Sequence, residues 1–411
     1  MTETVNVFGL GKIGTILSAL LAKAGFQVNG FDPNPSHCKK MFGGMDSPEP
    51  GFDGLLPFTK SVKINPDKSL AIPSATTSLV IVPTPSAPNG AYSLEYVLSA
   101  VEEILDHLGK DSRHIIVIKS TVLPGDIAQL ENLARSRNYT NIAFAYNPEF
   151  IALGDVIRNM TNPDLVLIGS RTEHASSFVH QINSRIFINN PQVAVLDIEE
   201  AELAKVALNS YITMKITFAN MVGRAAETLG SANPGRVLEA IGSDSRIGLK
   251  YLRPGLGFGG PCFPRDNHAL SKSLDSLGVD SDLLRSVDKF NKSIPDTFID
   301  KISAALDACK LPNPRLLIVG AAYKLGSPET VESQPLMIAN ELVESRPDTI
   351  VEIYDPIISK FLEQETSKFK YVETMEGIAY DVVFVALPYL TSSEVFGLLT
   401  PYGQVINPWG S

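Results

Sequence analysis

The strongest constraint on how this chain folds is a glycine-rich turn near its start, placed between an apolar run and a helical pattern. Residues 5–8 have the composition of a buried β-strand, and apolar residues follow at helical spacing over residues 16–23. Between them, Gly9, Gly11 and Gly14 form the pattern G-x-G-x-x-G. The first glycine allows a tight turn, the second lets backbone amides approach a pyrophosphate, and the third permits close helix packing. The succession predicts the first strand and helix of a doubly wound parallel sheet.

An acidic residue, Asp32, ends the next predicted strand, residues 26–31. Its carboxylate is placed to accept hydrogen bonds from both ribose hydroxyls and to repel a 2′-phosphate, so the pattern predicts NAD rather than NADP as the cofactor. The alternative is structural: the glycines only form a turn, and Asp32 caps the following loop. Thr84 and Thr121 each follow a later strand, and the alternative role for either threonine is to cap a helix. The cofactor-binding residues that we expect are Gly9, Leu10, Gly11, Lys12, Ile13, Gly14, Asp32, Thr84 and Thr121.

The rest of the chain divides into regions of different pattern. Buried strands are predicted at residues 79–82, 115–118, 142–145 and 165–168, then a long helix from about residue 197, helical pattern to about 306, and strands at 316–319, 350–354 and 382–386. We therefore expect an α/β protein with two Rossmann-like doubly wound parallel-sheet domains, joined by a long central helix and a helical middle domain. The predicted domain boundaries are 1–190, 191–308 and 309–411.

Composition excludes several classes of protein. The net charge of −10 over 411 residues argues against nucleic-acid binding, which needs a concentrated basic surface. No apolar run reaches the about 18 residues that a membrane span requires, and the N-terminus has no signal-peptide pattern. Three scattered cysteines fit neither a disulfide scaffold nor a thiolate metal site. We expect a cytoplasmic protein without a metal, a nucleic-acid partner or a membrane partner.

Two features could carry chemistry. Cys262 lies in the glycine- and proline-rich segment RPGLGFGGPCFPRD, which is unsuited to a helix or strand interior. Lys205 and Asn209 are spaced i to i+4 on the predicted long helix, so both side chains leave one face and can stabilise an oxyanion. The residues alone leave alternatives open: a lone cysteine is usually a small buried hydrophobe, and the helix face could be a solvated surface on which Glu202 pairs with Lys205.

The chain resembles the UDP-glucose, UDP-N-acetylhexosamine and GDP-mannose dehydrogenase family along nearly its whole length. The matching blocks, in order, are GLGKIG, VPTP, KSTVLPG, NPEFIALG, AELAKVALN, the DSRIG to GFGGPCFPRD block, and GAAYK followed by YDP. The resemblance implies NAD-dependent oxidation of the C6 primary alcohol of a nucleotide sugar to the carboxylate. The glycine-cysteine block is the most specific of these motifs, and GLGKIG is the least.

The resemblance also implies roles for individual residues. Cys262 matches the nucleophile that holds the intermediate aldehyde as a thiohemiacetal, which is oxidised to a thioester and hydrolysed. Lys205 and Asn209 match the oxyanion-stabilising pair, while Thr121, Glu149 and Asp266 match residues that hold the catalytic water and relay protons. The implied substrate-binding residues are Phe150, Ile151, Lys205, Asn209, Tyr251, Gly259 and Lys324, together with Arg246 offered by the neighbouring subunit of a homodimer.

The chain departs from the family pattern at four sites. Ala152 and Leu153 replace an Arg-Glu pair that the glucose and mannose enzymes carry, which moves the expected substrate toward the N-acetylhexosamine branch. Arg265 replaces a lysine, and keeps the charge with different hydrogen-bond geometry. Val331 stands where an arginine is expected, and Leu387 with Pro388 replaces a threonine at the end of the last strand.

Two other functions compete with this hypothesis. A two-electron 3-hydroxy-acid dehydrogenase shares the Rossmann and helical domains but needs neither the cysteine loop nor a second α/β domain. A noncatalytic nucleotide-sugar-binding homologue would keep the scaffold without turnover, and the missing Arg-Glu pair and Val331 favour it. The nucleotide base and the sugar are not fixed by the sequence.

Overall fold

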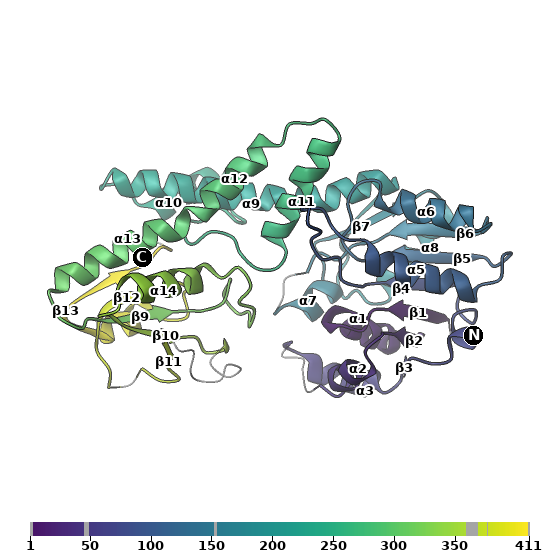
Figure 1. Ribbon diagram of the computed structural model, residues 1–411, viewed down its shortest axis with the longest axis horizontal. Helices are drawn as coiled ribbons and strands as arrows, with labels where there is room; N and C mark the ends of the chain where they lie inside the picture. The colour runs from purple at the N-terminus through teal and green to yellow at the C-terminus, as the bar shows by residue number, and fades with distance from the viewer. Residues whose placement is uncertain (1–2, 45–48, 152–153, 359–368, 376, 410–411) are drawn as a thin grey trace. The chain divides into compact units, whose positions relative to one another are not determined.

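The computed structural model describes residues 3–44, 49–151, 154–358, 369–375 and 377–409. The chain separates into two compact units, residues 1–208 and 209–411, and each contains its own sheet (Figure 1). Ala152 and Leu153, where the Arg-Glu pair is replaced, lie outside the described residues. The three-part division at residues 190 and 308 stays a prediction.

The sheet of the first unit has, within the described residues, eight strands in the order β3-β2-β1-β4-β5-β6-β7-β8. Neighbouring strands are parallel except for β6 and β7, which are antiparallel. The strands are β1 (Thr4–Phe8), β2 (Gln27–Phe31), β3 (Lys63–Ile64), β4 (Thr77–Val80), β5 (His114–Ile118), β6 (Ile142–Tyr146), β7 (Leu165–Ser170) and β8 (Gln192–Leu196).

Helices cover both faces of this sheet, because side chains alternate between the faces along each strand. Val7 packs into a core with α1 and α8, whereas the adjacent Phe8 packs into a core with α5 and α6. The helical segments of the unit are α1 (Lys12–Lys23), α2 (Pro35–Phe42), η1 (Phe52–Leu55), α3 (Leu56–Thr59), α4 (Lys68–Ala71), α5 (Glu95–His107), α6 (Asp126–Ser136), α7 (Val156–Thr161) and α8 (Glu173–Ser184).

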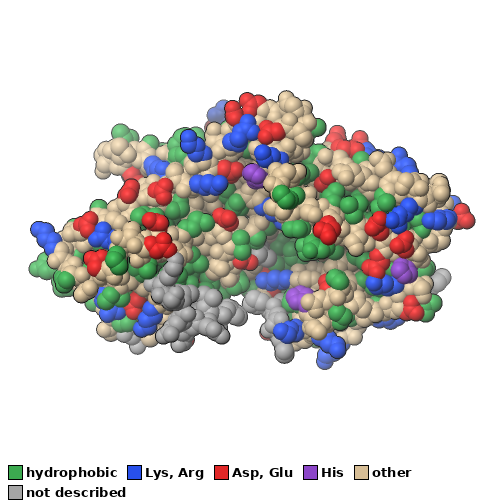
Figure 2. Space-filling view, in the orientation of Figure 1, with side chains coloured by type: hydrophobic (Ala, Val, Ile, Leu, Met, Phe, Trp, Pro, Cys, Tyr) green, Lys and Arg blue, Asp and Glu red, His purple; other side chains and the backbone are tan. Residues whose placement is uncertain are grey.

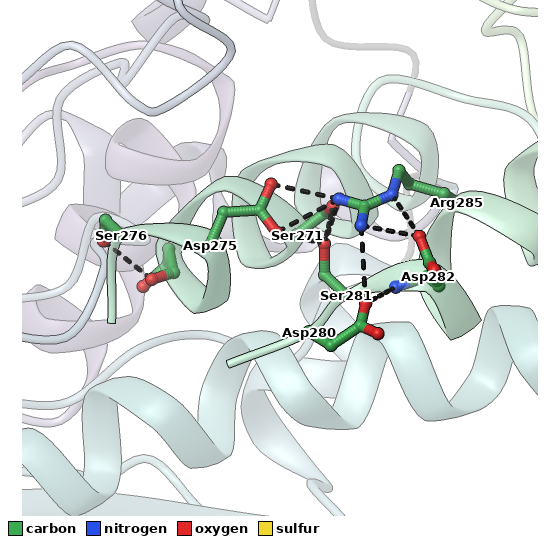
Figure 3. Close-up of polar contacts among 8 residues, drawn as sticks. Ser271, Asp275, Ser276, Asp280, Ser281, Asp282 and Arg285 are labelled. Atoms are coloured by element: carbon green, nitrogen blue, oxygen red, sulfur yellow. Dashed lines mark hydrogen bonds and ion pairs between the residues drawn. The ribbon is translucent and has the colours of Figure 1, made fainter. Parts of the chain in front are cut away.

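The long helix α9 (Ile198–Thr228) begins in the first unit and ends in the second. It is followed by α10 (Pro234–Gly242), α11 (Phe263–Ser276), α12 (Asp282–Lys292) and α13 (Ile294–Cys309). Arg285 of α12 holds the turn between α11 and α12: its guanidinium donates to Asp275 at 3.0 Å, to Asp282 at 2.6 Å and to Ser281 at 2.7 Å (Figure 3). This cluster fixes the C-terminal end of α11, whose N-terminal end carries Cys262.

The second unit contains, in its described part, a five-stranded parallel sheet in the order β11-β10-β9-β12-β13. The strands are β9 (Arg315–Val319), β10 (Ile350–Tyr354), β11 (Lys370–Tyr371), β12 (Tyr380–Phe384) and β13 (Leu399–Ile406), and the helices after the first strand are α14 (Gln334–Ser345) and α15 (Ser392–Gly397). Leu316 and Ile318 pack with α13 and α14, while Leu317 and Val319 face a separate core. The alternation again gives a layered α/β arrangement.

The structure confirms the predicted fold class of two parallel-sheet regions with a helical middle region. It differs from the sequence prediction because β7 is antiparallel to its neighbour β6. The short edge strands β3 and β11 and the outer strands β8 and β13 were not predicted. Two-residue strands carry no periodicity, and β8 exposes Val193 and Val195, so its apolar run is not that of a buried strand.

The described surface is chemically mixed. On the face seen in Figure 2, acidic and basic side chains are interspersed, with hydrophobic side chains among them. None of the helices in the described ranges combines the length and apolar character needed to span a bilayer.

A ladder of buried polar side chains crosses four neighbouring strands of the first sheet. Asn29 of β2 donates to Asn6 of β1 at 3.0 Å, and Asn6 donates to Ser78 of β4 at 3.3 Å. The hydroxyl of Ser78 lies 2.8 Å from Nε2 of His114 on β5. Burial lowers the pKa of His114 to about 4. The imidazole is therefore neutral in the folded protein at pH 5 to 7, whereas an unfolded histidine binds a proton below about 6.5.

This pKa difference predicts a pH-dependent loss of stability. Because the folded pKa is lowered, the contribution of His114 is complete above the unfolded pKa and is lost as the pH falls toward 4. Between pH 7 and pH 5 we expect His114 to account for about 2 kcal/mol of lost unfolding free energy. Urea unfolding of the wild type and of His114→Gln at both pH values measures this difference. Equal pH dependence in the two proteins would show that the pKa of His114 is the same in the folded and unfolded states.

Candidate active site

The glycine-rich turn in the first unit has the geometry of a dinucleotide cradle. Gly9 has φ +96°, and a Cβ there would lie 2.3 Å from the carbonyl oxygen of Ile81 on the neighbouring segment. A Cβ on Gly14 would lie 1.9 Å from the oxygen of Gly9, so the turn and α1 touch backbone to backbone. At Gly11, by contrast, no described atom lies within 4 Å of the Cβ position. The first and third glycines are required by packing, and the second keeps the start of α1 accessible to a phosphate.

Asp32 is oriented toward this turn. Its Oδ2 accepts a hydrogen bond from the amide of Leu10 at 2.9 Å, and its Oδ1 accepts one from the amide of Asn34 at 2.9 Å. Asn65 fixes the Asp32 backbone by accepting from its amide and donating to its carbonyl oxygen, both at 2.9 Å. Each carboxylate oxygen keeps a second lone pair, so the side chain fits two ribose hydroxyls. The residues present therefore fit NAD.

Lys12 and Ile13 complete the predicted cofactor loop. Lys12 pairs at 3.3 Å with Glu49, whose side chain is fully buried and also accepts from the amide of Val156 at 2.5 Å. Ile13 packs against the hydrophobic core on the α1 face of the sheet. Glu49 was missed by sequence reasoning, since it stands in a segment without regular periodicity. It links the cofactor turn to the start of α7.

The two threonines lie in adjacent loops after β4 and β5, at the carboxyl edge of the sheet. The hydroxyl of Thr84 donates to the carbonyl oxygen of Thr121 at 3.0 Å. Ser120 joins the same loops by donating to the carbonyl oxygen of Val82 at 2.7 Å. Ligands bind at this edge in open parallel sheets. The threonines are therefore at the position expected for cofactor contacts, and helix capping does not account for this hydrogen bond.

Helix α9 buries its polar face, so the alternative of a solvated surface is wrong. Glu202, Lys205 and Asn209 are 0%, 5% and 9% exposed. The ammonium of Lys205 donates to the carbonyl oxygen of Glu149 at 2.7 Å and lies 4.4 Å from the ring centroid of Phe150. Lys205 is thus brought together with two of the predicted site residues. Ile151, the next residue, is half-buried against the core of the α1 face.

A second buried lysine, Lys119, was missed although it lies in the quoted segment KSTVLPG. Its ammonium pairs with Glu149 at 2.6 Å and donates to Asn147 Oδ1 at 2.8 Å. The sequence feature that could have identified Lys119 is its position as a charged residue directly after the apolar strand β5. Glu149 is therefore flanked by two lysines, one at its carboxylate and one at its carbonyl oxygen, and Lys119 compensates its negative charge.

In the second unit, Asn209 and the cysteine loop come together. The side-chain amide of Asn209 donates to Asp266 Oδ2 at 2.7 Å, and Asp266 is 1% exposed. The amide of Asp266 donates to the carbonyl oxygen of Cys262 at 2.8 Å, which places Cys262 at the first turn of α11. Cys262 is exposed. The alternative that this lone cysteine is a small buried hydrophobe is therefore wrong.

The glycines before Cys262 are required by close packing within the second unit. A Cβ on Gly259 would lie 2.1 Å from the carbonyl oxygen of Glu332, and one on Gly260 would lie 2.6 Å from the ring of Tyr323. The amide of Gly260 also donates to the carbonyl oxygen of Val331 at 3.0 Å. Burial and the negative charges of Cys262 and Glu329 raise the pKa of Tyr323, so its phenol stays protonated. Tyr323, which lies in the quoted motif GAAYK, was also missed.

The remaining predicted substrate residues lie in different surroundings. Tyr251 is half exposed and has φ +63°, a backbone conformation that costs energy for a residue with a side chain. Arg246 pairs with Asp244 at 2.6 Å while its side chain is 85% exposed, and no contact to the other predicted site residues is recorded in the described chain. Lys324 follows Tyr323 after β9 and is half-buried.

The structure gives local explanations for the departures from the family pattern. Arg265 pairs with Asp266 at 3.3 Å, so its charge acts on the carboxylate that Asn209 also contacts. Val331 is exposed, and its carbonyl oxygen supports Gly260. Leu387 is buried directly against Gly320. The described residues contain no group of three or more His, Cys, Asp or Glu side chains arranged to hold a metal ion.

Comparison with known proteins agrees with this geometry. Residues 3–187 match the NAD binding domain of the UDP-glucose/GDP-mannose dehydrogenase family, and residues 199–293 match its central domain. The UDP-glucose 6-dehydrogenase of Rickettsia typhi is 31% identical over 77% of this chain and 72% of that protein. The GDP-mannose 6-dehydrogenase of Pseudomonas syringae pv. tomato is 29% identical over 98% of this chain and 88% of that protein.

Among solved structures, a UDP-glucose dehydrogenase from the hyperthermophilic archaeon Pyrobaculum islandicum has a TM-score of 0.84 and 28% identity, and covers 100% of this chain and 94% of that one. The Rossmann fold and its cofactor cradle thus define an NAD(H)-using dehydrogenase. The chain belongs to the UDP-glucose/GDP-mannose dehydrogenase family, and it is an enzyme of the nucleotide-sugar dehydrogenase class.

The orientation of Asp32 predicts the effect of removing its charge. We expect Asp32→Asn to lower kcat/KM for NAD by about 10- to 100-fold, because hydrogen bonds to a charged acceptor contribute about 1.5–3 kcal/mol. Its effect with NADP should be smaller, because the repulsion of the 2′-phosphate is relieved at the same time. Steady-state kinetics with both cofactors measure the change, and Asp53→Asn, an exposed position in η1, is the control. An equal loss with both cofactors would exclude the ribose role.

Proposed function

We propose that this enzyme oxidises the C6 primary alcohol of a nucleotide sugar to the carboxylate in two successive hydride transfers, with Cys262 as the covalent nucleophile. The observation that carries the proposal is the exposed thiol at the start of α11, one turn from the buried Asp266 that binds Asn209. NAD held by the glycine turn and Asp32 would supply the hydride acceptor for both oxidations, with two NADH per acid. The protein's own residues perform the remaining steps.

The first oxidation converts the alcohol to an aldehyde. The hydroxyl loses its proton to a water molecule, and the carbon loses a hydride; the family resemblance assigns Thr121, Glu149 and Asp266 to holding water and relaying protons. Lys205 and Asn209 stabilise the alkoxide, because an ammonium and an amide N–H one turn apart on α9 can both donate to one oxygen. Their burial supports this role, since hydrogen bonds to a developing charge are stronger where water is excluded.

The second oxidation proceeds on the enzyme. The thiolate of Cys262 adds to the aldehyde carbon, and the oxygen takes up a proton, which gives a thiohemiacetal. Loss of a hydride from carbon and a proton from the hydroxyl then forms a thioester. Water attacks the thioester carbonyl, the carbon–sulfur bond breaks, and the acid leaves as the thiol is restored. Lys205 and Asn209 stabilise the tetrahedral oxyanion during hydrolysis.

The substrate-binding part of the proposal concerns two groups of residues, one in each unit. Phe150 and Ile151, with Lys205, form one group in the first unit, while Tyr251, Gly259 and Lys324 belong to the second unit. Tyr323 adds a phenol that packs on the cysteine loop itself. We infer that the departures from the family pattern at positions 152, 153, 331 and 387 select the sugar. A panel of UDP- and GDP-sugars, with products identified by mass, tests which sugar is oxidised.

The nucleophile assignment predicts a clear defect in a serine variant. Cys262→Ser is expected to lower acid formation by at least about 1000-fold, because serine is a far weaker nucleophile at neutral pH. Wild-type enzyme should produce two NADH per acid, measured by absorbance and product mass. Cys309→Ser, at a cysteine outside the site, is the control and should keep full activity.

Three results would contradict the proposal. Normal acid formation by Cys262→Ser would remove the cysteine from the mechanism. One NADH per product would favour a two-electron dehydrogenase. Tight binding of a nucleotide sugar without NAD reduction across the panel would favour a noncatalytic binding protein.

We also propose that the enzyme acts as a homodimer joined through α9. Tyr211, Met214, Phe218, Met221 and Ala225 follow the i, i+3, i+7 spacing of a helix-packing seam, and Tyr211, Phe218 and Met221 are 56%, 43% and 49% exposed. Large exposed apolar side chains in such a row are typical of an interface. The exposed Arg246 is then available to a neighbouring subunit.

The dimer proposal predicts both assembly and complementation. Phe218→Asp should lower the mass in sedimentation from two chains to one, whereas Leu277→Asp, at an exposed apolar residue after α11, should not. Mixing inactive Arg246→Ala with inactive Cys262→Ser chains should restore part of the activity, because one site per heterodimer then has both residues intact. No recovery after subunit exchange would exclude Arg246 acting across the interface.

A further inference from the structure

Glu202 is a buried charged residue that the steps above do not use. It lies on α9 one turn before Lys205 and is 0% exposed. Its Oε2 accepts from the amide of Gly125 at 2.7 Å, and its Oε1 accepts from the amide of Ile127 at 2.9 Å. Both carboxylate oxygens therefore bind backbone N–H groups at the start of α6, and neither serves as a surface partner of Lys205.

The start of α6 explains why these contacts exist. The first amides of a helix have no partner within the helix, and a side chain at the N-cap usually accepts from them. Here the N-cap is Gly125, which has φ +94° and no side chain. The carboxylate of Glu202 takes this place from a distant part of the sequence. A negative charge at this end of a helix is also favoured by the helix dipole.

The segment that Glu202 binds ends the loop Thr121–Gly125, which follows β5 at the cofactor edge of the sheet. Thr121 is held from one side by the hydroxyl of Thr84 at 3.0 Å. Asp126 holds the middle of the loop by accepting from the amide of Leu123 at 2.7 Å. Glu202 fixes the end, and its two hydrogen bonds connect the loop to α9, the helix that carries Lys205.

We propose that Glu202 is a positioning residue, whose ionised carboxylate sets the distance between Thr121 and Lys205 by fixing the loop to α9. The inference rests on the proposed roles of Thr121 and Lys205. It follows that Glu202 acts through geometry and does not contact the substrate. A displacement of the loop would alter cofactor binding and the water held near Thr121, while the fold of the sheet stays intact.

The ionised state is required because two N–H groups converge on one carboxylate. A protonated carboxyl group turns one oxygen into a donor, which then faces an amide donor, so one of the two hydrogen bonds is lost. Burial raises the pKa of Glu202 to about 7, although the amides of Ile127 and Gly125 oppose this shift. The groups that act on it are Asp126, whose own pKa burial raises to about 6, and Glu199, which pairs with Arg171. Lys205 on the next turn is directed at Glu149 instead.

The test uses hydrogen exchange and kinetics on the intact enzyme. In the wild type, exchange protection of the Gly125 and Ile127 amides, corrected for the intrinsic pH effect, should fall about tenfold from pH 8 to pH 6. The value of kcat/KM for NAD should fall with it. Glu202→Gln carries an amide donor at all pH values, so it should show the low protection and low kcat/KM without this pH dependence. Glu227→Gln, the same change on an exposed residue near the other end of α9, should retain the wild-type profile.

Each outcome has a defined meaning. Unchanged protection from pH 8 to pH 6 in the wild type overturns the proposal, and this measurement needs no variant. Lost protection in Glu202→Gln with wild-type kinetics would show a capping residue without a positioning role. Glu202→Asp should recover part of kcat/KM at pH 8, since it keeps two acceptor oxygens on a shorter side chain. If the two-step chemistry fails but protection follows the predicted pH course, the proposed function is wrong and the anchoring of the loop stands.

Discussion

The buried polar face of α9 is the constraint on which the candidate active site depends. Charged and amide groups lose water when they are buried, so each needs a partner in the protein. Glu202 accepts hydrogen bonds from two backbone amides, Lys205 donates to the carbonyl oxygen of Glu149, and Asn209 donates to Asp266. These contacts tie one helix to the cofactor-side loop, the NPEF segment and the cysteine-bearing helix. The same few hydrogen bonds therefore stabilise the buried polar face of α9 and position the groups proposed to act in catalysis.

Glycines provide the complementary constraint in each of the two units. In the first unit, Gly9 and Gly14 allow backbone segments to touch, which leaves the start of α1 accessible for phosphate groups. In the second unit, Gly259 and Gly260 allow the cysteine loop to lie against Glu332 and Tyr323. A side chain at any of these positions would displace the backbone. The cofactor turn and the cysteine loop are thus each shaped by close backbone packing as much as by charged groups.

Sequence reasoning worked best where the signal is local. The strand, glycine turn, helix and Asp32 at the start of the chain follow from spacing alone, and α9 was located from its long apolar period. Spacing does not show whether a polar helix face is buried, so the sequence indicates only a surface pairing of Glu202 with Lys205. Lys119 and Tyr323 lay inside quoted motifs, but their importance comes from partners far away in sequence, Glu149 and Gly260. The antiparallel direction of β7 depends likewise on long-range pairing.

The central claim is that the sulfur of Cys262 becomes covalently attached to the sugar carbon during turnover. Peptide mass spectrometry of enzyme quenched in acid, while it turns over a nucleotide sugar with NAD, tests this claim directly. The account predicts a mass increase equal to the bound acyl group, confined to the peptide that contains Cys262. An enzyme that completes acid synthesis with no such adduct under conditions that preserve thioesters, or with the adduct on Cys38 or Cys309, would contradict it.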